Sequence, residues 1–124
     1  MDKFSRYYGW FVLIATGLPA LVRLASPRSM AEMTNEKMVI PEKRRRHRMW
    51  GWVSFWSSLG FIPIYIFLWK QNWVLIAVVI GVLTGLEMVR NAASFEIESL
   101  TTQNRIFGAI YALACVATYF ILIK

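Results

Sequence analysis

Residues 49–86 read MWGWVSFWSSLGFIPIYIFLWKQNWVLIAVVIGVLTGL, and Lys70 is the one charged residue among them. Lys70 divides the stretch into uncharged windows of 21 and 16 residues. An α-helix rises about 1.5 Å per residue, so roughly 20 residues cross the hydrocarbon core of a bilayer. Trp69 and Trp73 flank Lys70, and aromatic rings are typical of the headgroup level. The stretch therefore predicts two antiparallel membrane helices joined by a tight turn.

Two further uncharged windows lie outside this stretch, one of 16 residues after Arg6 and one of 18 residues after Arg105. Arginine at the end of a short span reaches toward the headgroups with its long side chain. Apolar residues make up 57% of the chain, above the roughly 45–50% of soluble domains. The sequence predicts one domain, residues 1–124, an all-α integral membrane bundle of four short transmembrane helices at 7–24, 49–69, 72–89 and 106–123.

The connection between the first two predicted spans, residues 25–48, is strongly basic. Eight of the 14 Lys and Arg residues lie between Arg23 and Arg48. The positive-inside rule places such a loop in the cytoplasm, which leaves both termini outside when there are four spans. We expect a multi-pass protein of the cell membrane with a cytoplasmic basic cluster formed by Lys43, Arg44, Arg45, Arg46 and Arg48.

A short interfacial helix is predicted within this loop, from about Met30 to Ile40. Ser29 and Glu32 have the spacing of a capping box at the start of a helix. Pro41 ends the predicted helix, because proline does not fit into a helix interior. A cleaved signal peptide is the alternative for the first span, but no small-x-small cleavage site follows it.

The net charge of +7 bears on the partners of the chain. A basic protein attracts the phosphates of nucleic acids as well as those of lipids. Most of the positive charge lies between two apolar stretches, where it orients a membrane protein. We therefore expect the lipid bilayer, with its anionic lipid headgroups, as a partner, together with other membrane proteins or further copies of the chain, and no nucleic acid.

Small residues recur along one face in each of the last two predicted spans. Such stripes let the backbones of two membrane helices approach closely, which favours helix association in lipid. The contact lies either within one chain or between copies of it. The helix-packing candidates are Ala77, Gly81, Gly85, Gly108 and Ala112.

Glu87 is an acidic residue near the end of the third predicted span, where an unpaired charge is costly. Arg90 follows at the i+3 position, which predicts a membrane-embedded ion pair between the two. A proton or substrate site is the alternative. Ser54, Ser57 and Ser58 give the second span a polar face, which suits either a helix contact or a permeation path.

The residue pattern predicts no catalytic, cofactor-binding or metal-binding residues. His47 lies among arginines, which disfavour its protonation, and Cys115 lies in an apolar run. No cofactor is expected, and an enzyme is not expected either. The sequence predicts a non-catalytic accessory, assembly or regulatory component that acts through helix packing, with a small oligomeric transporter or channel as the alternative.

Overall fold

The computed structural model of the chain describes residues 2–68 and 70–123, and nearly all of them are helical. The helices are α1 (Asp2–Ala25), α2 (Pro27–Met38), α3 (Pro41–Phe67), α4 (Asn72–Ala93) and α5 (Ile97–Thr118), which continues into a π-helical turn, η1 (Tyr119–Ile123). The predicted all-α fold is confirmed. Trp69, which we expected at the turn between two spans, lies outside the described residues.

Three helices in the described part of the chain are long and apolar enough to cross a membrane: Lys3–Ala25, Asn72–Ala93 and Ile97–Ile123. They contain three of the predicted spans and support a membrane location. The other predicted span, 49–69, lies largely in α3, which is not among the three. Its stretch from Trp50 to Phe67 contains Trp, Ser, Tyr and Pro, which are less hydrophobic than the aliphatic residues of α4. That span stays a prediction.

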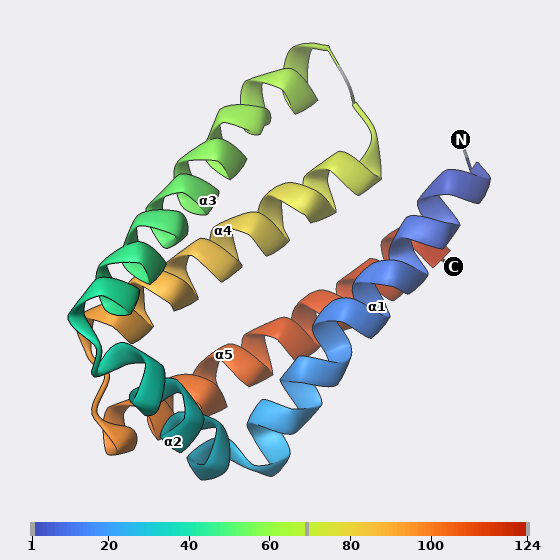
Figure 1. Ribbon diagram of the computed structural model, residues 1–124. Coiled ribbons are helices and arrows are strands. Elements are labelled where there is room, and N and C mark those ends of the chain that lie inside the picture. The colour runs from blue at the N-terminus through green and yellow to red at the C-terminus, as the bar shows by residue number, and fades with distance from the viewer. Residues whose placement is uncertain (1, 69, 124) are drawn as a thin grey trace.

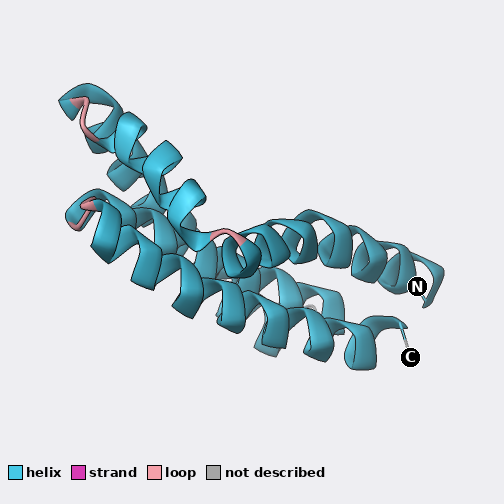
Figure 2. Cartoon of the chain, turned by 90° about the horizontal axis from the view of Figure 1, so that it is seen from below, coloured by secondary structure: helices cyan, strands magenta, loops and turns pink. Residues whose placement is uncertain are grey.

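The long helices form two antiparallel pairs, α1 with α5 and α3 with α4 (Figure 1). Both chain ends and the α3–α4 connection lie at one end of the bundle, which we call the terminal end (Figure 1). Helix α2 and the link between α4 and α5 lie at the opposite end, the α2 end, where α2 packs mainly against α5. The view from below shows that the loops between the helices are short (Figure 2).

Helix α2 begins earlier than the sequence predicts. Its first residue is Pro27, not Met30, and its last is Met38. Proline suits the first position of a helix because it has no backbone N–H to leave unbonded and its φ is already helical. Ser29 and Glu32 consequently lie inside the helix, and Glu32 forms an exposed ion pair of 3.7 Å with Arg28 instead of capping the start.

The basic cluster lies on a helix, whereas we expected it in a loop. Pro41 starts α3 where we expected it only to end a helix, and α3 then runs without interruption to Phe67. Lysine and arginine are good helix formers. Glu42 in the first turn complements the positive end of the helix dipole. The cluster from Lys43 to Arg48 is therefore continuous with the apolar part of the same helix.

An apolar core at the terminal end joins α1, α4 and η1. Its buried members are Val12, Ile76 and Leu122, and the partly buried Tyr8, Trp73 and Ile80 pack around them. The rings of Tyr8 and Trp73 meet edge to face with their centroids 5.7 Å apart. This core brings the terminal end of the α1–α5 pair against α4.

Helices α3 and α4 approach closely at two glycines of α4. A Cβ atom placed on Gly85 would lie 2.6 Å from the carbonyl oxygen of Gly51. One turn earlier, a Cβ atom on Gly81 would overlap the side chain of Ser58. Ser54 donates a hydrogen bond of 3.0 Å to the carbonyl oxygen of Gly81. Glycine at position 85 thus permits the backbone contact between these helices, since a side chain there would push them apart, and glycine at position 81 leaves room for the side chain of Ser58.

Helices α1 and α5 meet in a similar way around Gly108. A Cβ atom there would lie 3.0 Å from Cγ of Leu24 and 3.3 Å from the carbonyl oxygen of Ala20. Ala112, one turn further along α5, lines an apolar concavity of about 350 Å³ between the two helices. The glycines of both predicted stripes therefore contact other helices of the same chain.

The close contact at Gly85 predicts a strong asymmetry between two glycine-to-alanine changes. Gly85→Ala should destabilise the protein by about 1 to 3 kcal/mol, because the new methyl group meets backbone atoms that cannot move aside. Gly60→Ala is the matched control on α3, where a Cβ atom would meet nothing within 4 Å. It should leave stability unchanged or raise it, since alanine favours helix. Thermal unfolding in detergent checks both; equal midpoints would contradict the packing.

Candidate functional site

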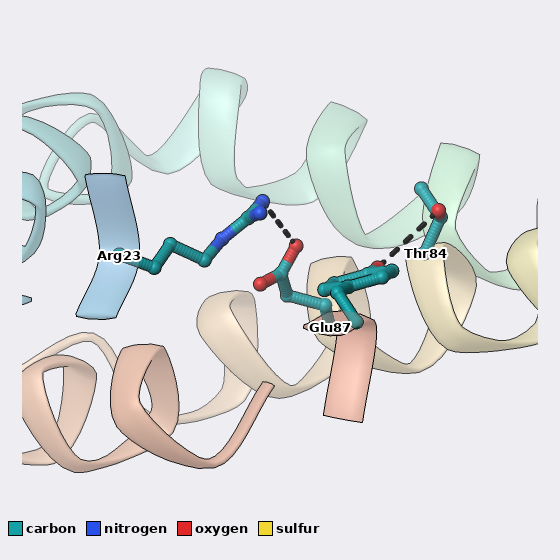
Figure 3. Close-up of polar contacts among 4 residues, drawn as sticks. Arg23, Thr84 and Glu87 are labelled. Carbon is teal, nitrogen blue, oxygen red and sulfur yellow. Dashed lines mark hydrogen bonds and ion pairs between the residues drawn. The ribbon is translucent and has the colours of Figure 1, made fainter. Parts of the chain in front are cut away.

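A buried ion pair links α1 to α4 near the α2 end of the bundle. Arg23 lies in the last turn of α1, and its Nη2 atom donates a hydrogen bond of 2.8 Å to Oε1 of Glu87 on α4. The two side chains are 18% and 8% exposed, so the pair is largely removed from the surface. Arg23 extends from α1 across to α4 to reach the carboxylate (Figure 3). The pair therefore joins one helix pair to the other.

Glu87 is paired with Arg23 and not, as the sequence predicted, with Arg90. Arg90 is exposed and lines a surface concavity with residues of α5, including Thr102 and Gln103. The expected pair rested on spacing within one helix, whereas Arg23 and Glu87 are 64 positions apart. The sequence did contain a signal for Arg23 as the partner. Arg23 ends an uncharged window, and a buried acid in a membrane helix pairs with a cation that a neighbouring helix can supply.

An aromatic ring and a hydroxyl group complete the site. The guanidinium carbon of Arg23 lies 5.1 Å from the centre of the Tyr111 ring on α5, within the range of a cation–π contact. Tyr111 in turn donates a hydrogen bond of 3.3 Å to Oγ1 of Thr84 on α4. Arg23 is therefore held on one side by a carboxylate and on another by the ring. Three helices contribute to the cluster, and Figure 3 shows Thr84 on the same helix as Glu87.

One carboxylate oxygen of this cluster has no hydrogen-bond partner among the residues that the structure describes. Oε2 of Glu87 is buried and accepts no hydrogen bond, and Oδ1 of Asn91, one turn further along α4, is in the same state. A buried polar atom without a hydrogen bond carries the full cost of its lost hydration. The pair with Arg23 compensates the charge of Glu87, but it satisfies only one of the two oxygens.

Three amide side chains, of which Gln103 and Asn104 are buried, form hydrogen bonds with backbone carbonyls at the α2 end. Asn104 donates a hydrogen bond of 3.0 Å to the carbonyl oxygen of Pro27, at the start of α2. Gln103 bonds the carbonyl oxygen of Ser94 at 2.9 Å. Asn35 bonds the carbonyl oxygen of Phe95 at 2.7 Å. None of these three contacts could be predicted from the sequence, because the partner of a buried or partly buried amide is visible only once the helices are packed.

The basic cluster divides into an inward and an outward part. Arg44 lies over the ring of Phe95, 4.7 Å from its centre, and donates a hydrogen bond of 3.3 Å to the carbonyl oxygen of Met38. His47 is half-buried, and its pKa lies below the usual value because of that burial and the positive charge of Lys37. The exposed members are Lys43, Arg45, Arg46 and Arg48.

The chemistry of the polar cluster is that of charge pairing and hydrogen bonding. Within residues 2–68 and 70–123, no group of three or more His, Cys, Asp or Glu side chains is placed to hold a metal ion. Cys115 is buried between α1 and α5, where it lines the apolar concavity next to Ala112. The arrangement holds helices together and keeps a carboxylate inside the bundle.

Comparison with known proteins gives no assignment for this arrangement. No protein-family model matches the chain, no curated protein matches its sequence, and no solved structure matches its fold.

The geometry predicts that Arg23, and not Arg90, supports Glu87. Arg23→Gln should lower the free energy of unfolding by roughly 3 to 5 kcal/mol, because it leaves a buried carboxylate without its cation. Arg90→Gln removes an exposed charge and should change it by less than about 0.5 kcal/mol. The double change Arg23→Gln with Glu87→Gln should recover part of the loss.

Denaturant titration of the purified protein in mixed micelles gives these values. A loss for Arg90→Gln as large as that for Arg23→Gln would contradict the pairing that the structure shows.

Proposed function

We propose that the chain is a four-span protein of the cell membrane that serves as a non-catalytic accessory, assembly or regulatory component, acting through helix contacts in the bilayer. In this proposal α3 crosses the membrane together with α1, α4 and α5. The α2 end faces the cytoplasm, and both termini lie outside. The contacts between its own helices give the chain the stable fold that such a component needs.

The course of α3 supports its role as a span. It is 27 residues long and lies antiparallel to α4, which is itself long and apolar enough to cross a membrane (Figure 1). Apolar side chains on the exposed side of a helix are typical of contact with lipid. Large apolar side chains fill that side of α3: Trp56 is 63% exposed and Phe67 is 79% exposed.

The distribution of charge supports the orientation. The start of α3, which carries the basic cluster, lies near the α2 end with α2, the end of α4 and the start of α5 (Figure 1). Arg28, Arg90 and Arg105 belong to these segments, whereas Lys70 belongs to the α3–α4 connection at the terminal end. An excess of Lys and Arg marks the cytoplasmic side of a membrane protein. Helix α2 would then lie at the cytoplasmic interface.

One observation carries the accessory role: three polar contacts join the long helices to one another, while many large apolar side chains of these helices are exposed. Glu87 bonds Arg23, Ser54 bonds the carbonyl of Gly81, and Tyr111 bonds Thr84. A coupling residue of a transporter has to meet water or substrate, whereas these groups form hydrogen bonds between helices. A protein that works by contact needs such a self-contained interior and an apolar exterior.

A small oligomeric transporter or channel is the second candidate, and one observation favours it. Oε2 of Glu87 is buried without a hydrogen-bond partner, so the carboxylate has a free position for a proton. Ser57 adds an exposed hydroxyl group to the membrane part of α3.

The proposed topology predicts which engineered cysteines a membrane-impermeant reagent reaches in intact cells. In a Cys115→Ala background, a cysteine at Gln71 should react from outside, whereas cysteines at Ser29 and Thr101 should react only after the membrane is opened. Labelling of Gln71 and Ser29 from the same side would refute four spans.

The accessory role predicts a stable complex with other membrane chains. The tagged protein, extracted in mild detergent, should migrate as a complex larger than itself that contains a second protein at fixed stoichiometry. The double change Arg23→Gln with Glu87→Gln should preserve that complex, because it removes both charges of the buried pair together and leaves neither unpaired. A pure homo-oligomer that moves protons across vesicle membranes, and stops doing so with Glu87→Gln, would favour the transporter.

A further inference from the structure

The outer face of the first turns of α3 forms a basic concavity. It has a volume of about 700 Å³ and is lined by residues of α3 alone: Glu42, Arg45, Arg46, Arg48, Met49 and Trp52. Arg45, Arg48 and Trp52 follow one another at the i, i+3 and i+7 positions, which places them on one side of the helix. The concavity therefore combines guanidinium groups at its start with an apolar and aromatic end.

The arginines of this concavity form no ion pair with any residue that the structure describes. Within residues 2–68 and 70–123, the ion pairs are Arg23 with Glu87 and Arg28 with Glu32, so Glu42 is paired with none of its arginine neighbours. Arg44 differs from them because it turns inward to Phe95 and Met38. Arg45, Arg46 and Arg48 thus present three positive charges on an outward face, and the complementary occupant is an anion.

The apolar end of the concavity decides which kind of anion fits. Met49 is 54% exposed and Trp52 is 43% exposed. The helix rises about 10 Å between Arg45 and Trp52, a distance comparable to the step from the headgroups of a bilayer to its upper acyl chains. A phosphate between the arginines would therefore leave acyl chains to run along Met49 and Trp52. A free phosphate ion would use the charges and none of the apolar wall.

We propose that this face of α3 binds the headgroup of an anionic phospholipid in the cytoplasmic leaflet. Arg45 and Arg48 hold the phosphate, since the planar guanidinium group suits phosphate oxygens, and Trp52 lies against the upper acyl chain. The inference rests on the proposed function, because it requires α3 to lie in the membrane. It adds a preference for anionic over zwitterionic lipid and assigns that preference to one face.

Quenching of tryptophan fluorescence by brominated lipids tests the site in vesicles. The full chain is reconstituted with brominated phosphatidylglycerol or brominated phosphatidylcholine, and the Trp52→Phe protein identifies the part of the quenching that comes from Trp52. We expect phosphatidylglycerol to associate with the Trp52 site more strongly than phosphatidylcholine. The double variant Arg45→Gln with Arg48→Gln should reduce this preference by about three- to tenfold.

The matched control is Arg90→Gln with Arg105→Gln, which removes the same charge at the same end of the bundle and should keep the preference. An unchanged preference in the Arg45 and Arg48 variant, when circular dichroism shows it folded, would overturn the proposal. So would complete competition by inorganic phosphate at constant ionic strength. Equal quenching by both lipids would reject the lipid site and leave α3 as a membrane span. No quenching of Trp52 by either lipid would reject both the lipid site and α3 as a membrane span.

Discussion

The ion pair between Arg23 and Glu87 is the constraint on which the arrangement of the two helix pairs depends. At the α2 end it links α1 directly to α4, and the apolar core links the same two helices at the terminal end. Lipid tails are as apolar as leucine, so membrane helices gain little from hydrophobic association. A charge on either helix, however, is costly in hydrocarbon until it meets its partner. The pair therefore fixes which side of α4 faces α1.

Within each helix pair the contact depends on small residues instead, because they determine how close the two backbones come. Gly85 lies against Gly51 and brings α4 onto α3, and Gly108 brings α5 onto α1. Close approach also makes backbone carbonyls accessible to side chains of the facing helix, as the bond from Ser54 to Gly81 shows. Close backbone approach at glycines thus acts within the pairs, whereas the ion pair acts between them together with the apolar core at the terminal end.

The sequence predicted what depends on local composition and missed what depends on distant partners. The uncharged window after Lys70 predicted a span at 72–89, and α4 runs from Asn72 to Ala93. The small residues of α4 and α5 were recognised from their spacing, and their glycines lie at helix contacts. By contrast, the partner of Glu87 lies 64 positions away, beyond any periodicity argument. Residues 25–48 were predicted to be a basic loop because they lie between two apolar windows, and Pro41 was expected to end a helix; Pro41 instead begins α3, in which Lys and Arg are good helix formers.

The continuity of α3 changes what its arginines can do. In a flexible loop, basic side chains sample many positions and attract any anion through their average charge alone. On a helix that runs on into an apolar stretch, the rise per residue and the direction of each side chain are fixed. Arg45 and Arg48 are then held on the same side as Trp52, and the distance from charge to ring is set by the backbone. A ligand that carries an anion and an apolar chain at matching separation gains from both contacts without ordering the protein further, which is the advantage of a preorganised site.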